Sequence, residues 1–479
     1  MPEPKTNITK NTSYLTAALI FQKILSLTYF TFLARELGPE NLGQYYLAIS
    51  FATVFSIIAD LGLANVLTRE VAKKQDEAKK LLGNVLGLKI PLAIITIIAV
   101  LSAIGFNNYS GLMRNLILVS LACVIMDSFT ATFYAVSRGF HNLKYESISS
   151  ALFHTIVISI GLPLLFWKAG LVSQMMALLA ASTFQFIFSF FIIWKKIKVP
   201  IIPAWDKKIL KEIILIGVPF AGFVIFQRLF TYLDSVMLGH FADARYVGYY
   251  QISFRIVFAL QFIPAAFTAA VYPAMSAFWA TNREQLKITF EKSMIYLALL
   301  ALPISAGVIA LADKIVLIFK SGYGEAVLPM RIIIFSVFFI FIGYPLGSLL
   351  NACDRQKQNT INMIIVSVLS IVANLILIPR FQAVGAAVTV LAANALMVIL
   401  GFYQSKKIAT FNYKKVFGTW FKIAISSAII GTTAFFLKER INIFLDIAIC
   451  IISYPILILL FQVVKKDEIL HIKNSFLAK

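Results

Sequence analysis

The sequence contains few of the residues from which catalytic and metal sites are built. Its 479 residues include only 4 histidines and 3 cysteines, and charged residues make up 14% of the chain. Cys123, Cys353 and Cys450 show no CxxC spacing, and no HExxH, Walker or nucleophile-elbow motif is present. These absences exclude a disulfide framework, a zinc site and the common hydrolase signatures. We therefore expect neither an enzyme nor a bound metal or cofactor.

Acidic residues are also scarce. The chain has 22 Asp and Glu against 43 Lys and Arg, which gives a formal net charge of +21. In a soluble protein this imbalance would indicate a nucleic-acid partner. However, 60% of the residues are hydrophobic and the mean hydropathy is +0.85. These values are typical of a polytopic membrane protein, so we expect lipid and not nucleic acid as its surroundings.

Long apolar runs account for most of the chain. A run of about 20 apolar residues is long enough to cross the hydrocarbon core as a helix. Only helices and closed barrels satisfy their backbone groups in lipid, so the runs predict an all-α protein with 14 transmembrane helices. The runs cover residues 13–33, 44–66, 82–105, 115–137, 147–167, 171–194, 213–237, 247–272, 293–312, 327–350, 359–378, 383–403, 417–437 and 442–464.

The basic residues indicate the orientation of these helices. Most of the 43 lysines and arginines fall in alternate loops, including a cluster from Arg69 to Lys89 that we assign to a cytoplasmic loop. Cytoplasmic loops carry an excess of Lys and Arg, so both termini are predicted to be cytoplasmic, in a plasma or inner membrane. None of the loops is long enough for a catalytic domain.

The chain also contains an internal repeat. Phe21-Gln22-Lys23 recurs 205 positions later as Phe226-Gln227-Arg228, and at the same offset Gly43 matches Gly248 and Tyr45 matches Tyr250. The repeat predicts six-helix bundles over 1–204 and 205–410, followed by helices 13 and 14 with a cytoplasmic tail over 411–479. Because six is an even number, the two bundles should be related by a pseudo-twofold axis along the membrane normal.

Besides Lys89, which we assign to the cytoplasmic loop, five cations lie within the apolar runs. A cation at the centre of a transmembrane helix costs about 2.5 to 3.5 kcal/mol on insertion scales, so it is expected to face water, a partner or a ligand. Arg331 and Lys422 lie near helix ends, where long side chains reach the interface. Lys23, Arg228 and Arg255 remain, and we predict that they line a cavity.

Polar side chains accompany these cations. Gln227 and Thr231 lie on one face of the seventh predicted helix, Gln22 and Ser26 are the corresponding residues of the first, and Gln251 lies one turn before Arg255. They could line a water-filled cavity or act as polar contacts between packed helices. The repeat favours the cavity, because polar packing does not require a cation in both copies.

Two intramembrane acids are candidates for a further role. Asp127 and Asp234 lie in the fourth and seventh predicted helices. Either could couple transport to a proton or a sodium ion, or could form a structural ion pair, Asp127 with Lys23 and either acid with Arg255. The sequence leaves both interpretations open.

The segment Ala34-Arg-Glu-Leu-Gly-Pro-Glu-Asn-Leu-Gly-Gln-Tyr-Tyr46 is followed by Asp60-Leu-Gly-Leu63 and Thr68-Arg-Glu70. This pattern resembles the polysaccharide flippases of the Wzx type, in the superfamily that also contains lipid II flippases and MATE multidrug exporters. Asp60 has no acidic counterpart in the second copy, where Ala265 stands, so we interpret Asp60-Leu-Gly-Leu63 as a structural turn.

The resemblance implies two six-helix bundles that face each other across a central cavity. It implies translocation of a polyprenyl-diphosphate-linked oligosaccharide from the cytoplasmic to the outer leaflet by alternating access, with other polysaccharide assembly proteins as further partners. Lys23, Arg228 and Arg255 suit the anionic diphosphate. A lipid II type flippase is the main alternative, because helices 13 and 14 resemble its extra helix pair. A MATE-like multidrug or cation antiporter is the second, but more acids than bases would be expected in its cavity.

Overall fold

The computed structural model describes residues 8–107, 109 and 111–463, with the side chains of 8–20, 219, 220 and 321 left out. The predicted tail after helix 14 lies outside these residues. The described residues form helices and no strand, as the sequence predicts. The α-helices are α1 (Ile8–Asp60), α2 (Leu63–Lys73), α3 (Ala78–Asn107), α4 (Gly111–Gly139), α5 (Lys144–Phe166), α6 (Leu171–Phe191), α7 (Lys207–Phe241), α8 (Ala244–Leu260), α9 (Phe262–Thr281), α10 (Arg283–Leu317), α11 (Val327–Ala352), α12 (Gln356–Ser405), α13 (Tyr413–Leu437) and α14 (Ile443–Leu460).

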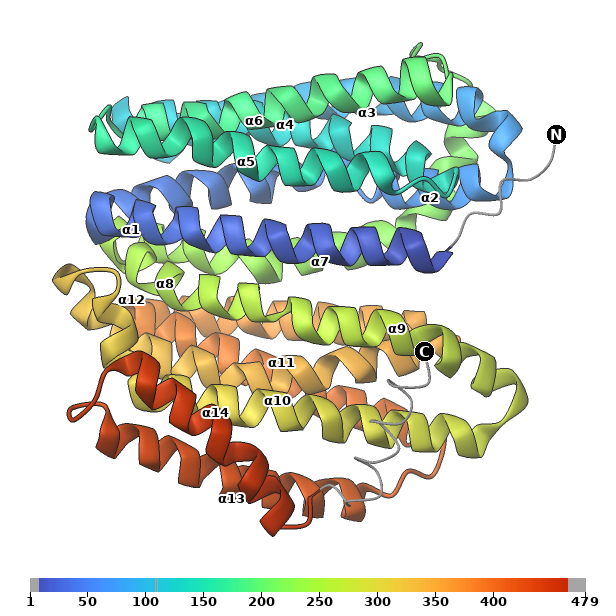
Figure 1. Ribbon diagram of the computed structural model, residues 1–479. Coiled ribbons are helices and arrows are strands. Elements are labelled where there is room, and N and C mark those ends of the chain that lie inside the picture. The colour runs from blue at the N-terminus through green and yellow to red at the C-terminus, as the bar shows by residue number, and fades with distance from the viewer. Residues whose placement is uncertain (1–7, 108, 110, 464–479) are drawn as a thin grey trace. The chain divides into compact units, whose positions relative to one another are not determined.

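The two longest helices are each a pair of helices joined at a kink. α1 has 53 residues and would be about 80 Å long if straight, more than twice the thickness of a hydrocarbon core. Its backbone leaves the helical region at Gly38 (φ 73°, ψ 174°), just before Pro39, and Figure 1 shows the ribbon reversing direction there. α12, with 50 residues, is interrupted in the same way at Gln382 (φ 47°, ψ −126°).

These kinks explain the number of membrane spans. Among the described residues, 12 helical segments are long and apolar enough to cross a membrane, and they include the segments of α1 and α12. Each of those two is divided by its kink into two limbs, while α8 and α9 form one segment interrupted at Gln261. Each limb is counted as one span. The total is fourteen, which confirms the prediction. α2 has only 11 residues and lies outside this count.

Internal contacts divide the chain into two compact units. The first unit contains Met1–Gln251 and Ser367–Gln382, and the second contains Ile252–Val366 and Ala383–Lys479. This division places α7 with the first unit, whereas the repeat predicts bundle boundaries at 204 and 410. The predicted bundles are defined by repeat symmetry and not by contact, so they stay a prediction.

Each unit has its own apolar core. In the first unit Leu67, Leu82 and Val136 bring α2, α3 and α4 together. In the second unit Met294 of α10 packs against Trp420 of α13. The indole Nε1 of Trp420 donates a hydrogen bond to the Met294 carbonyl at 3.2 Å. α13 therefore packs on α10, and Figure 1 shows α13 and α14 as the last two helices of the chain.

Candidate functional site

A fully buried lysine lies in the first unit. Lys89 of α3 is 0% exposed, and its Nζ lies 3.0 Å from Oδ1 of Asp60 and donates to Oγ1 of Thr132 at 2.7 Å. The ring of Phe129 on α4 lies 5.9 Å from the ammonium group. This lysine is paired and hydrogen-bonded, which is the condition under which a buried charge is tolerated.

The backbone after Asp60 places that carboxylate. Leu61 and Gly62 adopt positive φ angles of 43° and 74°, so α1 ends at Asp60 and the chain turns into α2. Glycine adopts this conformation without steric cost. The structure therefore contains the turn predicted for Asp60-Leu-Gly-Leu63, and it gives Asp60 a second role as the partner of Lys89.

The assignment of Lys89 to a cytoplasmic loop is wrong. Lys89 lies within α3, and its side chain is enclosed by protein. A signal was present in the sequence, because Lys89 falls inside the predicted apolar run 82–105 with Leu88 and Ile90 beside it. Like Lys23 and Arg228, Lys89 is a cation inside a predicted apolar run.

Arg228 lies in the middle of α7 and is half-buried. Its Nη1 donates to Oγ of Ser56 in the second limb of α1. Within the described part of the chain, no carboxylate lies within 4.0 Å of its guanidinium nitrogens. Asp127 of α4 is exposed.

Asp234, one and a half turns further along α7, has neutral partners. The Tyr250 hydroxyl donates to its Oδ2 at 2.9 Å, and the Asn374 amide of α12 donates to its Oδ1 at 2.6 Å. The carboxylate is buried, with 3% exposure. Beside it, Gln251 donates to Ser235 at 2.9 Å. The structure thus brings the predicted residues Asp234 and Gln251 into one polar layer between α7, α8 and α12.

The other polar residues predicted on α7 do not take part in these hydrogen bonds. Gln227 is exposed, and the Thr231 hydroxyl donates to the Gln227 carbonyl at 2.8 Å, one turn earlier in the same helix. Thr231 is therefore satisfied within its own helix, as is common for threonine in helices.

The remaining predicted residues are partly buried. Gln22, Lys23 and Ser26 lie on α1 in the first unit, and Arg255 lies on α8 in the second. Their arrangement around one cavity stays a prediction. Among the described residues there is no group of three or more His, Cys, Asp or Glu that could hold a metal ion.

The glycines shared by the repeat meet each other in the first unit. A Cβ at Gly43 would come closer than 3.0 Å to the Ala244 carbonyl, and a Cβ at Gly248 would come equally close to the Pro39 carbonyl. At the offset of 205, Gly43 corresponds to Gly248 and Pro39 corresponds to Ala244. Such a reciprocal contact is typical of a twofold axis. The crossing of α1 and α8 therefore has the local symmetry that the repeat predicts.

Comparison with protein families gives two matches. Residues 8–279 match the family described as "Polysaccharide biosynthesis protein", which is more than half of the chain. Residues 219–376 match the family described as "MatE". The two matches overlap in α7, α8 and α9.

Individual proteins are similar over nearly the whole chain. The protein named "Probable low-salt glycan biosynthesis flippase Agl15" of Haloferax volcanii is 23% identical, covering 96% of this chain and 97% of its own. The structure titled lipid II flippase MurJ, in an inward closed conformation, superposes with a TM-score of 0.77 at 18% identity, covering 93% of this chain and 98% of the other. An inward-facing multidrug resistance MATE transporter gives 0.69 at 16% identity, with coverage of 81% and 94%. The last two comparisons establish the shared fold.

Proposed function

Because the chain belongs to the polysaccharide biosynthesis protein family, we propose that it is a flippase for a polyprenyl-diphosphate-linked oligosaccharide, acting by alternating access from the cytoplasmic to the outer leaflet. The resemblance to Wzx-type flippases is confirmed by this family match. The similarity to a protein named as a glycan biosynthesis flippase, over 96% of the chain, supports the same class of cargo.

The observation that carries the proposal is the state of Arg228. An arginine in the middle of a membrane helix requires a partner, yet within the described residues this one has a serine hydroxyl and no carboxylate within 4.0 Å. Lys89, by contrast, is paired with Asp60 and hydrogen-bonded to Thr132. Arg228 therefore retains hydrogen-bonding capacity for an anionic group, and diphosphate oxygens suit its planar guanidinium. Lys23 and Arg255 are proposed to contribute further positive charge.

Replacing Arg228 with glutamine tests this role. We expect transport to fall at least tenfold, because a charge-assisted hydrogen bond to phosphate is worth about 1.5–3 kcal/mol. The thermal stability should stay near that of the parent, since the variant strands no carboxylate within 4.0 Å. Transport is measured in proteoliposomes as the fraction of labelled lipid-linked oligosaccharide that becomes accessible to an external glycosidase.

Arg228→Lys is the matched variant, because it keeps the charge but loses the planar, forked geometry. It should retain more transport than Arg228→Gln. Parental transport by Arg228→Gln would contradict the proposed clamp, and a large loss of stability would instead indicate a structural role for Arg228.

A lipid II type flippase is the second candidate. The favouring observation is the pair α13 and α14, together with the similarity to the lipid II flippase fold over 93% of this chain. The same proteoliposomes distinguish the two candidates when they are loaded with lipid II and with a lipid-linked oligosaccharide in parallel.

We propose that both termini are cytoplasmic, from the distribution of basic residues. Single cysteines are placed at Lys168, in the turn between α5 and α6, and at Lys79 and Lys207, near the starts of α3 and α7, after Cys123, Cys353 and Cys450 are replaced. A membrane-impermeant maleimide added to intact cells should label position 168 only. Labelling of position 79 or 207 in intact cells would contradict the proposed orientation.

A further inference from the structure

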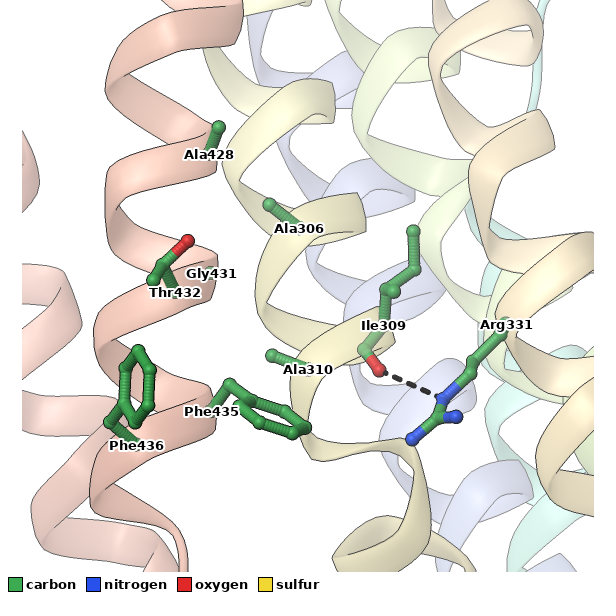
Figure 2. Close-up of a pocket in the computed structure, with 9 residues that line it drawn as sticks. All are labelled: Ala306, Ile309, Ala310, Arg331, Ala428, Gly431, Thr432, Phe435 and Phe436. Carbon is green, nitrogen blue, oxygen red and sulfur yellow. Dashed lines mark hydrogen bonds between the residues drawn. The ribbon is translucent and has the colours of Figure 1, made fainter.

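A groove in the second unit lies between α10, α11 and α13, towards the end where α10 and α13 finish. Its volume is about 510 Å³, which lies within the range of about 300–1,000 Å³ typical of small-molecule sites. Figure 2 shows small side chains along α10 and α13, two phenylalanine rings near the end of α13, and Arg331 on the opposite side. The lining residues are Ala306, Ile309, Ala310, Arg331, Ala428, Gly431, Thr432, Phe435 and Phe436.

The groove follows from the sizes of these side chains. Gly431 lets α13 approach α10 closely, because a Cβ there would lie 3.2 Å from the Cβ of Ala306. Towards the helix ends, the large rings of Phe435 and Phe436 are 49% and 67% exposed. Small residues next to large exposed rings leave an apolar space open to the surface, lined by segments that are long and apolar enough to span the membrane.

Arg331 supplies the polar end of the groove. It lies about one turn after the start of α11, is half-buried, and its Nε donates to the Ile309 carbonyl at 3.3 Å, as Figure 2 shows. In the described part of the chain it forms no ion pair within 4.0 Å. Its two terminal nitrogens therefore remain available to an anion.

Two acids at the ends of α10 and α13 are paired with lysines. Lys438 lies 2.7 Å from Asp313, and Lys314 lies 3.0 Å from Glu439, so these two ion pairs join the ends of α10 and α13. Arg331 consequently adds an uncompensated positive charge to an apolar groove. The complementary ligand is an amphiphile with an anionic group at one end and a hydrocarbon chain at the other.

We propose that this groove binds one anionic phospholipid of the surrounding membrane, with its phosphate at Arg331 and one acyl chain along the surface that α10 and α13 form. Arginine near a helix end reaches towards the headgroup region, where a phosphate can accept two of its hydrogen bonds. The small residues of α10 and α13 contact the chain, and the Phe435 and Phe436 rings flank it. This site is separate from Arg228 and does not depend on the proposed cargo.

The proposal is tested by lipid binding to the full-length protein. Delipidated protein in detergent is titrated with phosphatidylglycerol, and bound lipid is counted by native mass spectrometry. We expect Arg331→Gln to weaken the tightest binding event about tenfold, as loss of a charge-assisted contact predicts. Thr432→Phe should weaken it as well, because Thr432 is exposed and lines the groove, so the larger side chain fills the space while Arg331 stays intact.

Lys422→Gln is the matched control. Lys422 lies on the same helix α13, is exposed and carries the same charge, but it does not line the groove. This variant should bind phosphatidylglycerol like the parent. Equal binding by all four proteins would overturn the proposal. So would displacement of phosphatidylglycerol by an equimolar polyprenyl diphosphate, because the groove would then be a cargo site.

Discussion

Lys89→Met is expected to destabilise the folded protein by about 3–5 kcal/mol, the usual consequence of leaving one charge of a buried pair without its partner. Asp60 is only 7% exposed, and Lys89 is its only ion-pair partner within 4.0 Å among the described residues. The variant also removes the donor to Thr132. The measurement is the free energy or midpoint of unfolding of the purified protein in detergent.

Two further variants make this result specific. Lys89→Met combined with Asp60→Asn removes both charges and should recover most of the lost stability, because replacing a whole buried pair is often nearly neutral. Lys287→Met breaks an exposed pair with Glu284 at 3.5 Å and should cost less than about 1 kcal/mol. Full stability of Lys89→Met alone would show that Asp60 does not depend on this lysine.

Gly43→Ala and Gly248→Ala are each expected to cost 3 kcal/mol or more, above the range of about 1–3 kcal/mol that is usual for overpacking. Each new Cβ would come closer than 3.0 Å to a backbone carbonyl, of Ala244 or Pro39, and backbone cannot rotate away as a side chain can. The crossing of α1 and α8 would have to separate. Folded yield by size exclusion and the unfolding midpoint report this loss.

Gly307→Ala is the control for these two substitutions. Gly307 lies inside α10, and a Cβ there would meet nothing within 4 Å. Alanine is a better helix former than glycine, so this variant should be unchanged or stabilised by about 0.5–1 kcal/mol. If Gly43→Ala matched Gly307→Ala in stability, the close crossing would not exist in the folded protein.

The fold could be predicted largely from the apolar runs. The break between the runs 13–33 and 44–66 falls where Gly38 and Pro39 stand, and the structure turns there. The break between 359–378 and 383–403 is confirmed at Gln382. The break at Gln261 lies inside the predicted run 247–272, three residues before Pro264. Proline is tolerated in the first turn of a helix but interrupts a helix interior, so Pro264 is the signal for this break.

The polar contacts were less predictable, for a physical reason. A run of residues shows that a charge lies within a helix, but the partner depends on the rotation and depth of neighbouring helices. Asp60 and Lys89 are 29 residues apart, and Asp234 and Asn374 are 140 residues apart. The repeat identified Gly43 and Gly248 as equivalent, but only the structure shows that both lie at one helix crossing.

The Lys89–Asp60 pair also bears on how the chain enters the membrane during synthesis. Either charge alone in lipid would cost about 2.5–3.5 kcal/mol on insertion scales. At about 5–20 residues per second, a separation of 29 residues corresponds to roughly 1–6 seconds of translation. The second limb of α1 can therefore still lie beside the translocon when α3 emerges. The two helices can then leave it as a neutral hairpin, so that neither charge enters the bilayer alone.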